Sequence, residues 1–257
     1  MRRILFPLLR NELTKLFARP RSVMFLVFLA AFAVISGIIA EKTTSVMGAY
    51  GLAIRTLDIG RYFVLAFTVV LAAQTIADEF RDGTIKLLLI RPRSRGAIML
   101  SKWGAVVTLL CMSLLLLLLA SLAVGVLLLP RGTDGYTLWV VIRVYLYTLP
   151  NLLFYVGLSL LVGVLTASVP LSITLVVILN FMGSTFTRLA SGYPWSQWLV
   201  FRHLDLRGHD PSLLVRGTVD DATVGWLPLT ESAAIVVVYL IVCLAVTAYV
   251  FGRKEVK

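Results

Sequence analysis

The sequence predicts an all-α integral membrane protein with six transmembrane helices in a single domain, residues 1–257. Of the 257 residues, 59% are hydrophobic and 14% are charged, whereas soluble domains carry about 25% charged residues. Apolar runs of a length suited to crossing a bilayer, about 20 residues, recur along the chain. The charged residues gather between these runs, and the runs leave no room for a second large soluble domain.

The first 21 residues predict a basic amphipathic helix lying on the inner membrane surface. This segment holds six Lys and Arg residues and one acid, Glu12. Its apolar residues recur at helical spacing and form a stripe, at Leu9, Leu13, Leu16 and Phe17. Charge on one side and apolar groups on the other favour an interfacial position. A signal peptide is the alternative, but the charged region is too long for one.

Six apolar segments are expected to span the membrane, at residues 22–40, 61–77, 103–129, 138–165, 171–186 and 229–251. The polar, glycine-containing residues 41–60 predict a connector, and residues 166–170 predict a tight turn. Residues 188–228 form a long outer connector that carries three tryptophans. Because tryptophan favours membrane interfaces, this connector is expected to contain short helices at the outer interface.

The distribution of positive charge predicts the topology. Fifteen of the 24 Lys and Arg residues fall in 1–21, 78–102 and 252–257. Cytoplasmic loops carry such an excess, so both termini are expected to be cytoplasmic. The net charge of +11 does not indicate nucleic acid, because the bases lie at span ends, where they contact membrane lipids.

Four polar or helix-breaking residues within the spans are candidates for a transport pathway: Gln74, Pro150, Asn151 and Asn180. Simpler roles remain open for them. Gln74 suits a packing hydrogen bond to a neighbouring helix. Pro150 and Asn151 interrupt the fourth span, where proline produces a kink. Ser159 and Gly163 form a pair of small residues suited to close helix packing.

Residues 78–102 form the longest charged passage between two spans. Acids come first and bases last, which suits the dipole of a short helix from Asp78 to Ile90. Pro92 is expected to end this helix. Phe80, Ile85 and Leu88 give it a partly apolar side, as in helices that bind a groove of a partner protein. A basic loop that only fixes the topology is the alternative.

The passage resembles the signature of ABC-2 type transporter permeases. The matching residues are Glu79–Phe80–Arg81–Asp82–Gly83–Thr84, Leu87–Leu88–Leu89, Pro92, Ser94–Arg95 and Lys102. The resemblance implies a cytoplasmic coupling helix that docks on a separate ATPase, through Glu79, Phe80, Gly83, Thr84, Ile85 and Leu88. It also implies two ATP-binding ATPase subunits and a second permease copy, identical or paralogous. The expected location is the plasma or inner membrane of a bacterium or archaeon.

Other chemistry finds little support in the sequence. There is no phosphate-binding loop, so the chain is not expected to be an enzyme or to hold a cofactor of its own. His203, Asp205, His209 and Asp210 are the one cluster with metal-ligand character, and a solvated loop explains them more simply. The alternative functions are a secondary carrier or channel and an intramembrane enzyme. Missing mid-membrane acids count against a carrier, and missing catalytic motifs count against an enzyme.

Overall fold

Long α-helices make up most of the structure. This computed structural model describes residues 2–43, 48–81, 95–129, 135–217 and 227–253, with the backbone alone at 2–6, 77–81 and 95. The long helices are α1 (Arg2–Ala18), α2 (Pro20–Thr43), α3 (Ala49–Arg81), α5 (Arg95–Leu128), α6 (Leu138–Thr166), α7 (Val169–Leu189) and α9 (Leu229–Arg253). The ranges above contain no β-strand. All of these helices except α1 are long and apolar enough to cross a membrane, which confirms the predicted class and the six spans.

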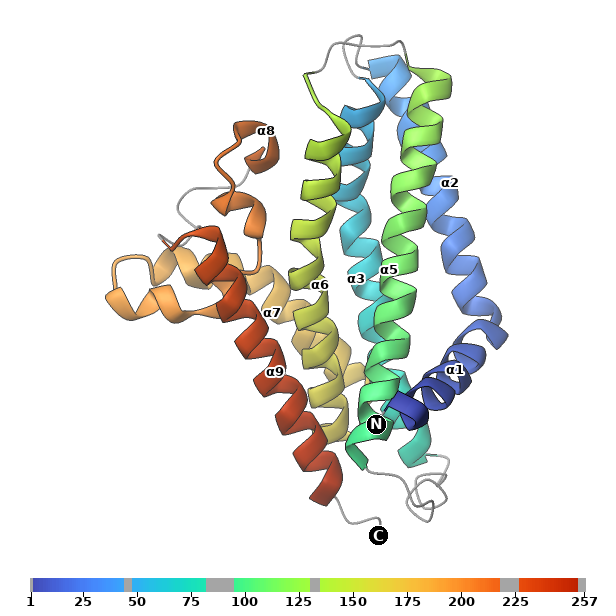
Figure 1. The fold of residues 1–257 in the computed structure, drawn as a ribbon, viewed down its shortest axis with the longest axis vertical. Helices are drawn as coiled ribbons and strands as arrows, with labels where there is room; N and C mark the ends of the chain where they lie inside the picture. Colours follow the sequence, from blue (N-terminus) through green and yellow to red (C-terminus); the bar gives the residue numbers. More distant parts are fainter. Residues whose placement is uncertain (1, 44–47, 82–94, 130–134, 218–226, 254–257) are drawn as a thin grey trace.

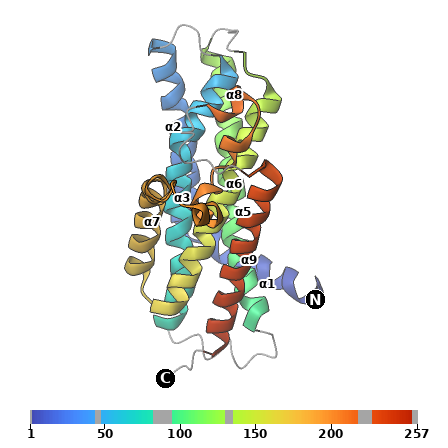
Figure 2. The ribbon, with the colours of Figure 1, turned by 90° about the vertical axis from the view of Figure 1, so that its left-hand side faces the viewer.

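The helices form one elongated bundle. In Figures 1 and 2, α3, α5 and α6 run along its length, and α7 and α9 lie beside its lower half. α1 and the last residues of α9 lie near the end where α3 stops and α5 begins (Figure 1). We call this the termini end, and the opposite one the far end.

The expected connector at 41–60 is wrong for most of its length. α2 continues to Thr43, and α3 already begins at Ala49. Gly60 marks close helix packing, since a Cβ there would lie 2.6 Å from Leu117 Cδ2 on α5. Asp58 pairs with Arg207, so this charged residue is accommodated within a helix that extends beyond the apolar run.

Other helix bounds also differ from the predicted spans. α5 begins at Arg95, eight residues before the predicted third span, and α6 continues through Pro150 and Asn151 as one helix. That proline was expected to interrupt the span. Of the predicted helix from Asp78 to Ile90, only the first four residues lie in the described chain, where they continue α3.

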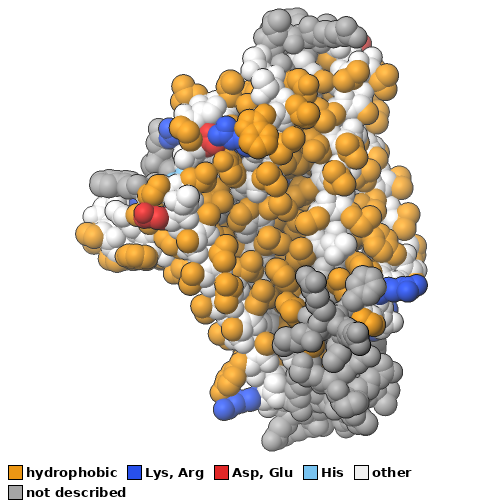
Figure 3. Space-filling view, in the orientation of Figure 1, with side chains coloured by type: hydrophobic (Ala, Val, Ile, Leu, Met, Phe, Trp, Pro, Cys, Tyr) orange, Lys and Arg blue, Asp and Glu red, His pale blue; other side chains and the backbone are white. Residues whose placement is uncertain are grey.

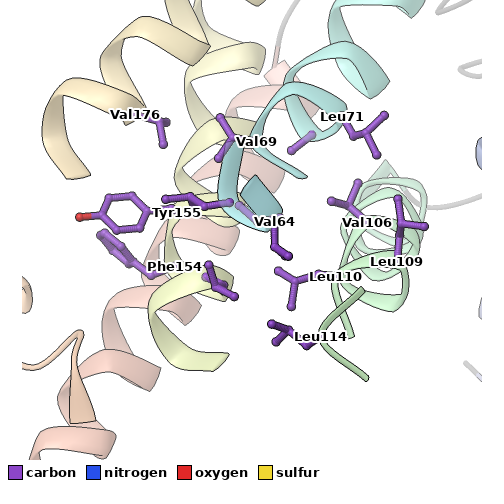
Figure 4. Packing of buried hydrophobic residues seen from close by; sticks show 14 of the residues in the cluster. Val64, Val69, Leu71, Val106, Leu109, Leu110, Leu114, Phe154, Tyr155 and Val176 are labelled. Atoms are coloured by element: carbon purple, nitrogen blue, oxygen red, sulfur yellow. The ribbon is translucent and has the colours of Figure 1, made fainter. Parts of the chain in front are cut away.

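The core lies where α3 packs between α5 and α6. Figure 4 shows Val64 of α3 facing Leu110 of α5, while Tyr155 of α6 lies near Val176 of α7. The hydroxyl of Ser159 donates to the Val69 carbonyl at 2.8 Å. A Cβ on Gly163 would lie 3.6 Å from Ala73 Cα. The predicted close packing at Ser159 and Gly163 is therefore confirmed, and it joins α6 to α3.

The outer surface of the bundle is strongly apolar. Large apolar side chains are exposed along α2, α7 and α9, and Figure 3 shows them covering most of one face. Helices that leave such surface exposed while satisfying their own backbone hydrogen bonds are suited to a lipid environment. The chain is a multi-pass membrane protein.

The contact between α5 and the start of α3 gives a test of this packing. A Cβ on Gly125 would lie 2.6 Å from the Ala49 backbone, whereas one on Gly96 of the same helix meets no described atom within 4 Å. Overpacking costs about 1–3 kcal/mol, while alanine favours an open helix site by up to about 1 kcal/mol. We therefore expect Gly125→Ala to lower the melting temperature in detergent and Gly96→Ala to leave it equal or higher. A Gly125→Ala protein that melts at or above wild type would contradict the packing.

Candidate functional site

A segment of short helices lies between α7 and α9. It consists of η1 (Pro194–Trp198), η2 (Val200–Arg202), η3 (Leu206–His209) and α8 (Leu213–Arg216), so the short helices expected in the long connector are confirmed. Capping residues limit the length of η3 and α8. The Asp205 side chain accepts from the Arg207 backbone N–H at the start of η3, and Gly217 ends α8 with a φ of 57°. We call residues 194–216 the short-helix segment.

Arg207 joins this segment to α3. Its guanidinium donates through Nε and Nη2 to both carboxylate oxygens of Asp205, at 3.0 and 2.9 Å. Nη1 donates to Asp58 of α3 at 2.7 Å. Arg61, one helical turn along α3, approaches Asp205 at 3.5 Å. Bidentate pairs between arginine and a carboxylate are strong and directional, so Arg207 fixes the segment on the side of α3.

The environment keeps both partners ionised. Burial alone would raise the pKa of Asp205, but hydrogen bonds and charge from Arg207, together with the charge of Arg61, hold that pKa below its usual value. Burial also acts to lower the pKa of Arg207, and the bonds to Asp205 and Asp58 outweigh it and raise the pKa. The opposite charges therefore persist across the physiological pH range.

Two histidines join the segment to α9. His203 Nε2 lies 2.7 Å from the Gln197 carbonyl, and Nδ1 lies 3.0 Å from Ser232 Oγ. Since a carbonyl only accepts, Nε2 carries the proton and Nδ1 accepts from the serine. His209 donates from Nδ1 to the Leu227 carbonyl at 3.0 Å, and the two rings stack at 5.7 Å.

The suggested metal cluster is used in other ways. Both ring nitrogens of His203 are hydrogen-bonded. Asp205 binds Arg207, and Asp210 pairs with Arg143 of α6. Within the described ranges, no three His, Cys, Asp or Glu side chains are grouped to hold a metal ion. The four residues fasten the segment to the helices around it.

A polar cavity of about 480 Å³ lies beneath the short-helix segment. From α3 it is lined by Asp58, Arg61 and Tyr62, and from α6 by Asn151 and Tyr155. The ion pairs of Arg207 therefore form part of its wall.

α7 and the short-helix segment close the other sides. α7 contributes Asn180, Gly183, Ser184 and Arg188, which recur at helical spacing on one face. The segment contributes Phe201, Leu204, Asp205 and Arg207. A Cβ on Gly183 would lie 2.8 Å from the Phe201 ring, so the glycine allows α7 to approach the segment closely.

The structure brings together two of the four predicted pathway residues. Asn151 and Asn180 both line the cavity, while Pro150 and Gln74 do not. Gln74 lies thirteen residues from Arg61, about 20 Å along α3. Its Oε1 is buried without a described hydrogen-bond partner, so the packing hydrogen bond expected for it is not found among the described residues.

Of the charged residues of the cavity, the sequence singled out Asp205 alone, as part of a metal-like cluster. Asp58 was expected in a connector, and Arg61, whose guanidinium contacts Asp205 and Tyr62, was not predicted as a site residue. Arg207 was expected in the long outer connector, residues 188–228. Opposite charges within a largely apolar sequence indicate ion pairs, but the sequence does not show which acid pairs with which base.

The termini end holds a second ionic cluster. Glu12 of α1 accepts from Lys102 of α5 and from Lys15, both at 3.2 Å. Lys102 is only 2% exposed. Leu16 is buried, and Leu9, Leu13 and Phe17 pack against the core. The apolar stripe of α1 therefore faces the protein, where a membrane surface had been expected.

The predicted coupling residues precede Lys102 of this cluster in the sequence. Glu79 and Phe80 fall in the last turn of α3, where only the backbone is described. Gly83, Thr84, Ile85 and Leu88 lie outside the described residues.

Arg207 and Asp58 differ in burial, which predicts unequal effects of substitution. Arg207 has a side chain 9% exposed, whereas that of Asp58 is 43% exposed. We expect Arg207→Gln to destabilise the protein by about 1–3 kcal/mol, because it removes the buried guanidinium that donates to both carboxylates. Asp58→Asn should cost less than about 1 kcal/mol. Denaturation of the purified variants in detergent measures both, and equal losses would contradict the geometry.

Burial of His203 predicts acid sensitivity. Burial, opposed by the Gln197 carbonyl and assisted by His209 and Arg202, lowers the pKa of His203 in the folded state. Below the unfolded pKa of about 6.5, the unfolded chain binds a proton that the folded chain resists. Stability therefore falls as pH drops from about 6.5 toward the folded pKa. His203→Gln should reduce the fall in melting temperature between pH 7.5 and 5.5, and an unchanged fall would refute this role.

Comparison with known proteins places this fold in a family. Residues 21–257 match the family described as "Protein of unknown function (DUF2705)", a match that takes in α3 to α9 and all the lining of the cavity. The "Uncharacterized protein YhcI" of Bacillus subtilis (strain 168) is 25% identical over 208 residues, covering 74% of this chain and 64% of that protein. The matched part is thus less than two thirds of the relative's length. Because the family match covers residues 21–257, the chain belongs to the DUF2705 family.

Proposed function

We propose that this chain is the permease subunit of an ABC-2 type exporter, driven by a separate ATP-binding cassette ATPase. Support comes from the signature residues between Glu79 and Lys102 and from the six spanning helices around them. In this proposal the cavity beneath the short-helix segment is part of the route of the cargo, with Asn151 and Asn180 on its wall.

The continuity of α3 is the observation that carries the proposal. A single helix runs from Ala49 to Arg81, so it holds Asp58 and Arg61 of the cavity and ends with Glu79 and Phe80. From Asp58 to Glu79 the helix rises about 32 Å. A partner that shifts the Glu79 end acts through a stiff element on the cavity. Coupling requires the ATPase to bind this end differently in its two nucleotide states.

The ionic cluster at the termini end supports the same mechanism. Lys102, the last residue of the signature, is joined to α1 through Glu12. α1 and the start of α5 therefore form one unit on which an ATPase can act. In this proposal α1 also contacts the membrane surface and the ATPase.

The orientation is proposed from charge and aromatic residues. The Lys and Arg excess of residues 1–21, 78–102 and 252–257 supports a cytoplasmic termini end, in a bacterium or archaeon. Tyr193, Trp195 and Trp198 are exposed at the other end of α7, where aromatic residues suit the outer interface.

Two permease copies and two ATPases complete the proposed assembly. Ser159 and Gly163, the small-residue pair of α6, are buried against α3. The contact between copies therefore uses other residues, and either an identical chain or a paralogue can supply it.

A secondary carrier or channel is the competing function, and one observation favours it. Asp58 lies within a spanning helix and lines the cavity beside Arg61. Intramembrane charges often mark ion-coupled transport. Transport that continues without any ATPase would support the carrier.

The proposal predicts a selective effect of Glu79→Ala/Phe80→Ala. We expect the double variant to insert and fold normally, because the expected interface with the ATPase lies outside the bilayer. Co-purification with its ABC ATPase, first identified by pull-down with the wild-type chain, should fall at least fivefold, and ATP-driven transport in liposomes should fall with it. Arg253→Ala, at the termini end of α9, is the control and should behave as wild type. Wild-type association, ATP turnover and transport in the double variant would refute the coupling role.

A further inference from the structure

We propose that the cavity beneath the short-helix segment binds the anionic phosphate headgroup of an amphiphile, whose chains lie along the exposed face of α7. The role of this amphiphile as cargo rests on the proposed permease function, whereas its binding does not. Four features of the described residues support the assignment.

The first feature is the level of the cavity in the membrane. Arg188 lines the cavity at the last turn of α7, and η1 follows within a few residues. On η1, Trp195 and Trp198 are 53% and 67% exposed. Tyr239 of α9 donates to the Trp198 carbonyl at 3.0 Å, which fixes these aromatics beside α9. Exposed tryptophans mark the headgroup level of a bilayer, so the cavity opens where lipid headgroups lie.

The second feature is charge. The cavity lining contains three arginines and two aspartates, a balance of one positive charge. Asp205 and Asp58 both accept hydrogen bonds from Arg207. Arg61 and Arg188 add positive charge to the described lining, which favours a ligand with a negatively charged head.

The third feature is a buried donor that lacks a described partner. Arg61 Nη2 donates to the Tyr62 hydroxyl at 3.2 Å, and Nη1 lies 3.5 Å from Asp205. Its Nε is buried with no hydrogen-bond partner among the described residues. A buried unsatisfied donor is unfavourable. A phosphate oxygen would satisfy it, and the amides of Asn151 and Asn180 offer further donors in the lining of the same cavity.

The fourth feature is the apolar surface next to the cavity. Phe181 stacks on Tyr62 at 6.4 Å and remains 67% exposed. Ile178, Met182 and Phe186 extend this exposed surface along α7. A polar cavity beside a lipid-facing apolar strip suits a molecule with a charged head and apolar chains. The volume of about 480 Å³ lies within the range of small-molecule sites and suits the head alone.

Binding can be measured on the purified full-length chain in a non-ionic detergent, with no ATPase or ATP present. Dihexanoylphosphatidylglycerol is the probe, titrated by calorimetry. Dihexanoylglycerol, which lacks the phosphate, and inorganic phosphate, which lacks the chains, are the two comparison ligands. We expect the probe to bind at least tenfold more tightly than either. Equal affinity for dihexanoylglycerol would overturn the headgroup assignment, and equal affinity for inorganic phosphate would overturn the amphiphile.

Variants locate the site. Arg61→Gln/Arg188→Gln should weaken probe binding at least tenfold. Ser184→Glu introduces a negative charge at an exposed position of the lining, where it repels an anionic head and lies one helical turn from Arg188. It should weaken binding similarly, and its exposed position covers the case in which the double variant misfolds. Arg10→Gln/Arg253→Gln, which removes the same charge at the termini end, should bind as wild type. Wild-type affinity in Ser184→Glu, or equal weakening in the control, would overturn the site.

The outcomes separate binding from the permease proposal. Loss of binding in the cavity variants together with a silent Glu79→Ala/Phe80→Ala substitution leaves a lipid-binding membrane protein without ATPase coupling. The reverse pattern leaves the permease proposal in place and removes the amphiphile.

Discussion

The short-helix segment and the cavity beneath it depend on the hydrogen bonds that the buried guanidinium of Arg207 donates. The guanidinium is almost fully removed from solvent, yet it bonds one carboxylate on its own segment and another on α3. Desolvation opposes the burial of any charge, so the geometry must be complete for the arrangement to persist. Because Asp205, Asp58 and Arg207 all line the cavity, the same bonds that hold the short-helix segment also shape the candidate site.

Polar contacts join the short-helix segment to three helices of the bundle, besides its packing on α7. Arg207 binds α3, Asp210 binds Arg143 of α6, and His203 binds Ser232 of α9. A movement of any of these helices therefore changes the lining of the cavity. α3 is the most direct route, since it continues to the turn that carries Glu79. In the proposed permease, this connection gives a mechanical reason for linking the signature at one end of the bundle to the polar cavity further along it.

The sequence predicted the membrane-spanning helices well because each is a long apolar run, and length alone identifies such runs. It also predicted the packing of Ser159 and Gly163, since small residues one turn apart have few other uses in a span. It did not predict the pairing of Asp58 with Arg207, which are 149 residues apart. The glycines of residues 41–60 suggested a connector, but Gly60 is needed for the approach of Leu117. The Asp58–Arg207 pair and the helical packing at Gly60 both depend on contacts between segments far apart in the sequence.

Hydrogen exchange of the backbone amides tests the dependence of the short-helix segment on Arg207 most directly. Wild type, Arg207→Gln and Arg216→Gln are compared in the same detergent, with Arg216 as an arginine of the same segment outside the cavity lining. Amides in residues 194–216 should exchange at least tenfold faster in Arg207→Gln than in the other two proteins, while the amides of α5 keep their protection. Equal protection of residues 194–216 in wild type and Arg207→Gln would show that other contacts hold the segment, and it would contradict the role assigned to this guanidinium.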